Sequence, residues 1–136
     1  MDTIRYTLPS AQKLKRKKLI EELFRSGKQI RDSDLLLFYK EHNYKVEAGL
    51  QVGFSVSKRR FKKAVDRNRI KRLMREAWRY EKLTLQDLLE KHQRKVIIML
   101  LFTGNQKPEQ IEIKRKISLL LQELQVQLKK KFDVIL

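Results

Sequence analysis

The residues best suited to chemistry are cations repeated along one side of a predicted helix. Its apolar stripe recurs at i, i+3, i+4, i+7 and i+8, as Ile70, Leu73, Met74, Ala77 and Trp78. The opposite side carries Asn68, Lys71, Arg72, Arg75 and Arg79, with Arg67 and Arg69 on the flanks. Guanidinium groups bind phosphate oxygens through paired hydrogen bonds, so this face suits a phosphate-rich partner. The alternative, a basic face that is merely solvated, fits a lone charge run better than this spacing and density.

A second cluster of cations precedes the helix, and only Asp66 offsets it. The cluster comprises Lys58, Arg59, Arg60, Lys62 and Lys63. With Asp66 as the N-cap, Arg67 and Arg69 fall in the first turn, where the helix dipole disfavours positive charge. A phosphate bound there meets free backbone N–H groups as well as guanidinium groups. This end of the helix is therefore predicted to contact a polyanion.

The composition supports the same interpretation. The 136 residues include 33 Lys and Arg against 16 Asp and Glu, which gives a net charge of +17 and an isoelectric point near 10.3. Nucleic acid is the expected partner rather than a membrane, because the longest apolar run, residues 96–102, has the length of a strand. No cysteine is available for disulfides or thiolate metal sites, and no apolar signal region begins the chain, so a cytoplasmic protein is expected.

The elements that position these cations begin with an extended arm over residues 1–12. A basic first helix follows over residues 13–25, with Leu19, Ile20, Leu23 and Phe24 facing inward and Gly27 as its stop. Strands are predicted over residues 28–31, 35–40 and 50–57, the last two pairing antiparallel through a loop at 42–49. Apolar and small side chains alternate along the third strand, as Val52, Phe54 and Val56 against Gly53, Ser55 and Ser57. One face of that strand is therefore buried and the other has room for a ligand.

The second half of the chain is predicted to complete a sheet and cover it. A short helical turn is expected at residues 84–92, a buried central strand at 95–102, a closing helix at 113–128 and a basic tail at 129–136. The prediction is one domain over residues 1–136 with an α+β fold. It is a two-layer sandwich of about four strands in a mixed sheet with three main helices.

Residues 52–79 resemble the bacterial ribonuclease P protein subunit, whose signature is a Gly-hydrophobic-Ser-Val-Ser-Lys strand followed by an Arg-Asn-Arg helix. The strand positions are Gly53, Ser55, Val56, Ser57 and Lys58, and the helix positions are Ala64, Arg67, Asn68, Arg69, Lys71, Arg72, Leu73, Arg75 and Glu76. Leu23, Phe24 and Gly27, and the strand Leu36, Leu37 and Phe38, extend the resemblance, which is weak beyond Val96.

The resemblance implies an auxiliary protein that helps a catalytic RNA remove the 5′ leader of precursor tRNA. The RNA carries out the hydrolysis, with Mg²⁺ held by RNA and substrate, and the protein needs no cofactor, protein partner or membrane. The residues implied in binding the catalytic RNA are Lys58, Arg59, Arg60, Arg67, Asn68, Arg69, Lys71, Arg72, Arg75 and Arg79. A cleft between the first helix and the open sheet face is implied for the leader, with Ile20, Phe24, Phe38, Tyr39, Ser55 and Ser57. The family also implies a left-handed strand-helix-strand crossover, where general preference favours the right-handed form.

Two departures from the family pattern affect these expectations. Ile20 stands where many relatives have Phe, so stacking on leader bases should be weaker there, with Tyr39 as a candidate substitute. Residues 59–63 are one residue longer than in many relatives and carry Phe61 where a glycine is common. Apart from the resemblance, Phe24 and Phe38 are better explained as core residues of amphipathic elements, and only the resemblance favours the cleft.

A catalytic centre within the chain is not indicated. His42 and His92 lie far apart, without metal-ligand spacing, and are expected at the surface. Glu21 with Glu22, and Asp32 with Asp34, form no convergent pair of carboxylates for two-metal hydrolysis. Three functions are left open: a subunit of a ribonucleoprotein nuclease, a ribosomal or general RNA-binding protein, and a stand-alone nuclease. A general binder should ignore the leader, and a stand-alone nuclease should cut without added RNA.

Overall fold

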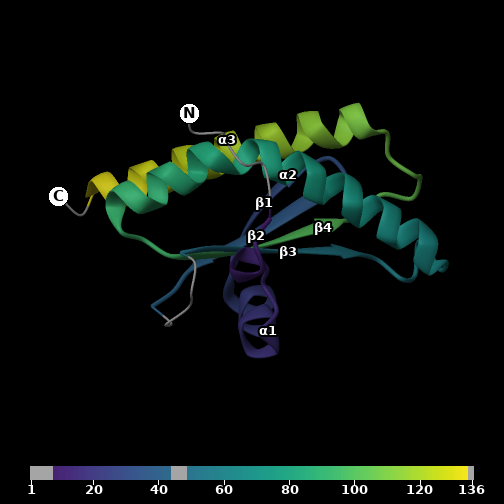
Figure 1. Cartoon of the computed structure of the whole chain (residues 1–136), viewed down its shortest axis with the longest axis horizontal. Coiled ribbons are helices and arrows are strands. Elements are labelled where there is room, and N and C mark those ends of the chain that lie inside the picture. Colours follow the sequence, from purple (N-terminus) through teal and green to yellow (C-terminus); the bar gives the residue numbers. More distant parts are fainter. Residues whose placement is uncertain (1–7, 44–48, 135–136) are drawn as a thin grey trace.

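The computed structural model describes residues 8–43 and 49–134, which form four strands, three α-helices and one 3-10 turn (Figure 1). In chain order these are η1 (Ser10–Gln12), α1 (Lys17–Ser26), β1 (Lys28–Asp32), β2 (Leu35–Glu41), β3 (Leu50–Val56), α2 (Ala64–His92), β4 (Val96–Phe102) and α3 (Gln110–Val134). The predicted arm lies outside the described residues as far as residue 7. None of the described helices is long and apolar enough to cross a membrane.

The four strands form one mixed sheet in the order β1-β2-β4-β3. β1 pairs antiparallel with β2, β2 antiparallel with β4, and β3 parallel with β4. The predicted α+β fold with a central fourth strand is confirmed, as is the crossover from β3 through α2 to a parallel β4. The predicted antiparallel pair of β2 and β3 is wrong, because β4 lies between them and takes both as neighbours.

Helices cover both faces of the sheet (Figure 1). α2 and α3 pack on one face over a core that includes Leu37, Val52, Ile98 and Leu100, and these layers form the predicted sandwich. α1 lies on the other face, where Leu19 and Leu23 join a separate cluster with Leu36, Phe38, Ile97 and Met99. β2 is buried from Leu35 through Tyr39 because neighbouring side chains point to opposite, covered faces. The two clusters hold α1 and α2 on opposite sides of one rigid sheet.

α2 is one helix of 29 residues, whereas the sequence predicted a basic helix and a separate turn at 84–92. The apolar stripe continues from Trp78 through Leu85 and Leu89, so there is no reason for a break. The predicted cap is also corrected: Lys63 is the N-cap residue, without a side-chain cap, and Asp66 lies in the first turn.

The start of α1 and the end of α3 also differ from the prediction, because packing and pairing override local pattern. α1 begins at Lys17 rather than residue 13, since the Leu14 N–H donates to the Val52 carbonyl at 2.8 Å and holds that segment against β3. α1 ends at Ser26 with Gly27 as the C-cap residue, as predicted, and a Cβ at Gly27 would lie 2.4 Å from the Leu23 carbonyl oxygen. α3 continues through the predicted tail to Val134, because Phe132 extends its buried face beyond Leu128.

Candidate nucleic-acid interfaces

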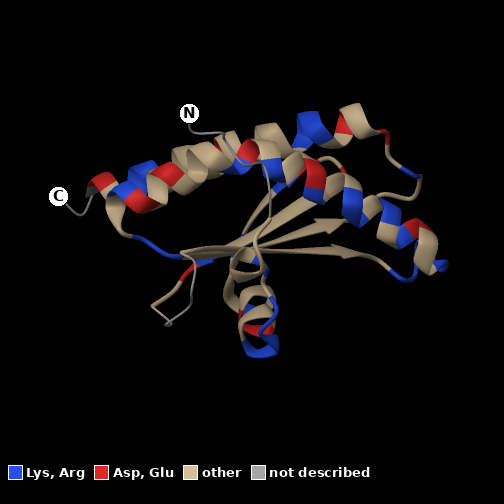
Figure 2. Ribbon diagram, in the orientation of Figure 1, with Lys and Arg blue, Asp and Glu red and all other residues tan. Residues whose placement is uncertain are grey.

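Cations follow the loop before α2 and the outward side of its first half (Figure 2). We call this the α2 surface, defined by Lys58, Arg59, Arg60, Arg67, Asn68, Arg69, Lys71, Arg72, Arg75 and Arg79. The predicted apolar stripe faces the core, with Ile70, Met74, Ala77 and Trp78 buried, so the cations face outward as expected. Asn68, Arg69 and Arg72 are exposed and make no hydrogen bond or ion pair with the described part of the chain. These three side chains are free to bind a ligand.

Other cations of the α2 surface make contacts within the protein. The Arg67 guanidinium donates to the carbonyls of Phe61 and Lys62 at 2.7 and 2.8 Å, which fixes the loop against the start of α2. Phe61, which stands where a glycine is common in the family pattern, is buried with its ring centroid 6.0 Å from that of Phe102. Arg75 lies over the Phe54 ring at 5.8 Å. These cations contribute charge to the surface while they shape it.

The far end of the α2 surface meets a buried lysine. Lys82 is 2% exposed, and its ammonium donates to the Gln12 side-chain oxygen at 2.7 Å. Burial and the nearby Arg79 lower the pKa of Lys82 below its ordinary value. The contact ties η1, which runs beside β3, to α2. Lys82 therefore stabilises the packing of η1 against α2 and is not part of the exposed cationic surface.

The α1 side of the sheet gathers most of the predicted leader residues. Phe38 and Ile20 belong to the cluster beneath α1, and strand register places Gly53 and Ser55 beside Met99 and Leu101 on the same face. Ser57 follows directly after β3 and is half-buried. Phe24 is 40% exposed, whereas Phe38 is 6% exposed, and their rings meet edge to face with centroids 4.8 Å apart. Phe38 is thus core, and Phe24 offers the accessible ring.

Tyr39 does not belong to this surface. It lies on the opposite face of the sheet, within the core beneath α2 and α3, and its hydroxyl donates to the side-chain oxygen of Gln127 on α3. Burial, with a smaller contribution from Glu123, raises the pKa of the Tyr39 hydroxyl. The reason is the alternation of side chains along β2, which sends Phe38 and Tyr39 to different faces. The predicted role of Tyr39 in leader binding is therefore corrected.

Replacing Tyr39 with Phe should test this placement. We expect Tyr39→Phe to lower the free energy of unfolding by about 1 kcal/mol, through the lost hydrogen bond to Gln127. Binding of any single-stranded ligand on the α1 side should be unchanged, because the hydroxyl lies across the sheet. Urea unfolding and RNA titration of the same preparation measure both quantities. Weaker RNA binding with unchanged stability would contradict the placement.

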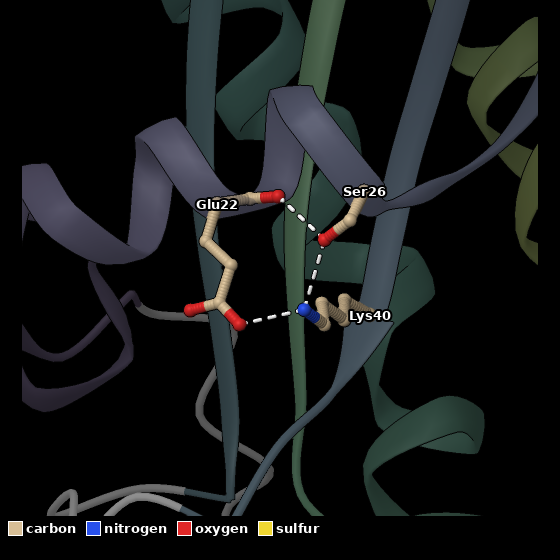
Figure 3. A network of polar contacts seen from close by, with 3 residues as sticks. All are labelled: Glu22, Ser26 and Lys40. Atoms are coloured by element: carbon tan, nitrogen blue, oxygen red, sulfur yellow. Dashed lines mark hydrogen bonds and ion pairs between the residues drawn. The ribbon is translucent and has the colours of Figure 1, made fainter.

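A polar network that the sequence analysis missed fixes α1 over β2 (Figure 3). The Lys40 ammonium binds the Glu22 carboxylate at 2.6 Å and the Ser26 hydroxyl at 2.9 Å. Ser26 in turn donates to the Glu22 carbonyl at 3.0 Å. Lys40 lies two residues after Phe38, and side chains two residues apart on a strand point to the same face. This spacing could have placed Lys40 beneath α1 from the sequence alone. The network holds the turn of α1 that carries Phe24.

Several of the carboxylates and histidines considered as catalytic candidates make contacts within the described part of the chain. No group of three His, Cys, Asp or Glu side chains there could hold a metal ion. The candidate carboxylates Glu22 and Asp34 are bound by Lys40 and Lys116, each at 2.6 Å. His42 was expected at the surface but is buried. Its pKa is lowered mainly by this burial and then by the positive charge of Lys95, while the negative charge of Glu22 opposes the shift. His92 packs beside Phe132 with ring centroids 5.0 Å apart.

Comparison with known proteins gives a consistent result. The family model described as Ribonuclease P matches residues 8–125. The ribonuclease P protein component of Chlorobium phaeobacteroides is 45% identical over 80 residues, which cover 57% of this chain and 55% of that protein. The corresponding protein of Porphyromonas gingivalis strain ATCC 33277 is 32% identical over 104 residues, or 76% of each chain. The match thus spans about half of the Chlorobium protein.

Solved structures resemble the chain in fold. A mutant of the Staphylococcus aureus RNase P protein superposes with a TM-score of 0.63 at 19% identity, covering 85% of this chain and 89% of that one. Another structure of the Staphylococcus aureus protein gives a TM-score of 0.58 at 18% identity, covering 83% and 94%. The strand order and the parallel crossover thus belong to a known architecture.

Proposed function

The chain belongs to the family of bacterial ribonuclease P protein components, and we propose that it acts as the protein subunit of a ribonuclease P holoenzyme. In this role it binds the catalytic RNA and the 5′ leader of precursor tRNA in the cytoplasm. It assists the endonucleolytic removal of the leader, while the RNA performs the hydrolysis. Mg²⁺ is bound by the RNA and the substrate, and no further protein is needed.

The observation that carries the proposal is the free cationic side of α2. Arg69, Arg72 and Asn68 project from a helix whose other side is locked into the core, so they are presented without the cost of ordering a loop. Their fixed spacing suits several phosphates of a folded RNA. By neutralising crowded phosphates, the α2 surface lowers the Mg²⁺ concentration that the RNA needs to fold and act.

The α1 side supplies the second proposed contact. Exposed Phe24 provides a stacking platform that any base can use, and the small, half-buried side chain of Ser55 leaves space on the same face of β3, whereas the Met99 side chain fills the space over Gly53. Ile20 contributes an apolar surface rather than a ring. Leader binding therefore depends mainly on Phe24, and the α1 and α2 contacts are separable because they lie on different sides of the sheet.

The deciding experiment is cleavage of precursor tRNA at low Mg²⁺ by a bacterial ribonuclease P RNA, with and without this protein. Substrates with and without a leader of several nucleotides are compared. We expect faster cleavage with the protein and tighter binding only for the leader-bearing substrate. Equal binding of all RNAs with unchanged cleavage would favour a general RNA-binding protein. Cutting by the protein without the RNA would instead identify a stand-alone nuclease.

A further inference from the structure

A polar hollow of about 680 Å³ lies beyond the ends of β3 and β4, and of its lining residues only Arg60 has a role in the proposal above. Three segments that are far apart in the sequence meet there: the β1 to β2 turn, the loop before α2 and the loop after β4. Its lining includes Arg31, Ser33, Arg60, Thr103, Asn105 and Gln106. The volume falls within the roughly 300 to 1,000 Å³ of small-ligand sites. Such sites are usually lined by apolar residues, whereas every lining residue here except Gly104 is polar or charged, so a polar or charged occupant is indicated.

The walls of the hollow are held by their own contacts. The backbone N–H and the hydroxyl of Thr103 both donate to the Asp34 carbonyl, at 2.7 and 3.0 Å. Gly104 packs so tightly that a Cβ there would lie 2.7 Å from a carboxylate oxygen of Asp34. Arg60 donates to the Asn105 side-chain oxygen at 2.6 Å, which joins the loop before α2 to the loop after β4. The hollow is therefore a built feature of the three segments.

The charge of the hollow favours an anion. Asp34 is the one carboxylate among its described lining residues, and the Lys116 ammonium binds it at 2.6 Å. Arg31 and Arg60 are both exposed, and their positive charges remain in excess once Asp34 is paired. Two guanidinium groups facing one space suit a phosphate, to which each donates paired hydrogen bonds.

The side-chain amides of Asn105 and Gln106, which line the hollow beside the arginines, indicate which kind of anion fits it. The Asn105 side-chain oxygen accepts from Arg60, so its NH₂ group is directed to other acceptors, and Gln106 is exposed with both donors and an acceptor. Amides of this kind pair with the edges of nucleobases, which are accessible in unpaired nucleotides. An occupant that combines a phosphate with an exposed base satisfies both halves of the lining.

We propose that this hollow binds one unpaired nucleotide of the catalytic RNA, with its phosphate at Arg31 and Arg60 and its base edge at Asn105 and Gln106. The proposal rests on the proposed function. The catalytic RNA is favoured over the leader because Arg60 belongs to the same loop as Lys58 and Arg59. The loop after β4 is also tied to α2 by the Lys107 to Asp66 ion pair at 3.1 Å. The hollow thus extends the α2 surface around the end of the sheet.

The first test is Arg31→Gln, assayed by titration with a bacterial ribonuclease P RNA over a range of salt concentrations. We expect affinity to fall about tenfold, as for the loss of one charged hydrogen-bonded contact. The slope of log K against log salt should flatten by about 0.7, as for one single-strand phosphate. The preference for leader-bearing substrate should be unchanged.

The matched control is Lys130→Gln, which removes one exposed charge at the other end of α3. It should bind the RNA like the unchanged protein. If Arg31→Gln has the same RNA affinity and salt dependence as Lys130→Gln, while the unchanged protein still binds and activates the RNA, the hollow binds no nucleotide and this inference is wrong. If the unchanged protein itself neither binds nor activates the RNA, the proposed function has failed instead.

A second test locates the nucleotide directly. The chain has no cysteine, so Glu109→Cys, in the exposed loop just past the hollow, provides a single site for a tethered iron chelate that cleaves nearby RNA. We expect cuts at one short unpaired segment of the catalytic RNA, and their loss when Arg31→Gln is added. Cuts confined to paired helices, or cuts that persist with Arg31→Gln, would overturn the assignment.

Discussion

Removing two free arginines from α2 should nearly abolish binding of the catalytic RNA at physiological salt. We expect Arg69→Ala with Arg72→Ala to weaken affinity by about 100-fold to 10,000-fold, since each charged hydrogen-bonded contact contributes roughly 1.5 to 3 kcal/mol. Both side chains are exposed and without partners in the described part of the chain, and Ala favours helix, so the fold should not suffer. Titration at several salt concentrations measures the effect. The slope of log K against log salt should flatten by about 1.4 to 1.8 for two lost phosphate contacts.

Lys91→Ala is the control for this double variant. Lys91 is exposed in the last turn of the same helix, so its removal changes net charge and helix composition without touching the α2 surface. Only a small, nonspecific loss of affinity is expected from it. Equal losses from Lys91→Ala and from either single arginine variant would mean that overall charge, rather than a defined surface, binds the RNA.

Removing the accessible ring on the α1 side should eliminate most of the preference for leader-bearing substrate. We expect Phe24→Ala to weaken binding of precursor tRNA by about 1 to 3 kcal/mol, the usual contribution of one stacked base. Binding of a leaderless substrate by the same holoenzyme should not change. The lost edge contact with Phe38 should cost about 0.5 to 1.5 kcal/mol of stability, which unfolding measurements can separate from binding.

Two companion variants sharpen the test of Phe24. Phe24→Tyr keeps a ring at the same place and should retain the preference for leader. Ile20→Phe adds a second ring one turn earlier on α1, beside the existing platform, and should strengthen that preference. If Phe24→Ala weakens leaderless and leader-bearing substrates equally, Phe24 acts through the fold and the leader contact lies elsewhere.

The sequence was sufficient to predict the elements that carry a strong local pattern. The four strands lie within about a residue of their predicted positions, and the α2 stripe from Ile70 to Trp78 faces the core as its spacing indicated. The cations opposite that stripe could be assigned outward for the same reason. The continuous apolar runs of β2 and β4 also contained the information that both faces of the sheet are covered.

Features that depend on contacts between segments far apart in the sequence could not be predicted from the local pattern of apolar and polar residues. Nothing within β2 or β3 specifies that β4 separates them, because alternation sets a strand's faces but not its neighbours. The start of α1 depends on the hydrogen bond from Leu14 to Val52, and the hollow depends on Arg31, Arg60 and Asn105, from three distant segments, lining one space. The error at Tyr39 was avoidable, because adjacent strand residues cannot share a face.

The central position of β4 also constrains how the chain acquires its shape during synthesis. β2 and β3 share no hydrogen bonds and are joined only through β4, so the sheet cannot close until Val96 to Phe102 has left the ribosome. At roughly 5 to 20 residues per second, the stretch between Val56 and Val96 takes a few seconds to make. Throughout that interval β2 can pair with β1 but lacks its β4 neighbour, so the nascent chain exposes apolar strand residues that favour aggregation.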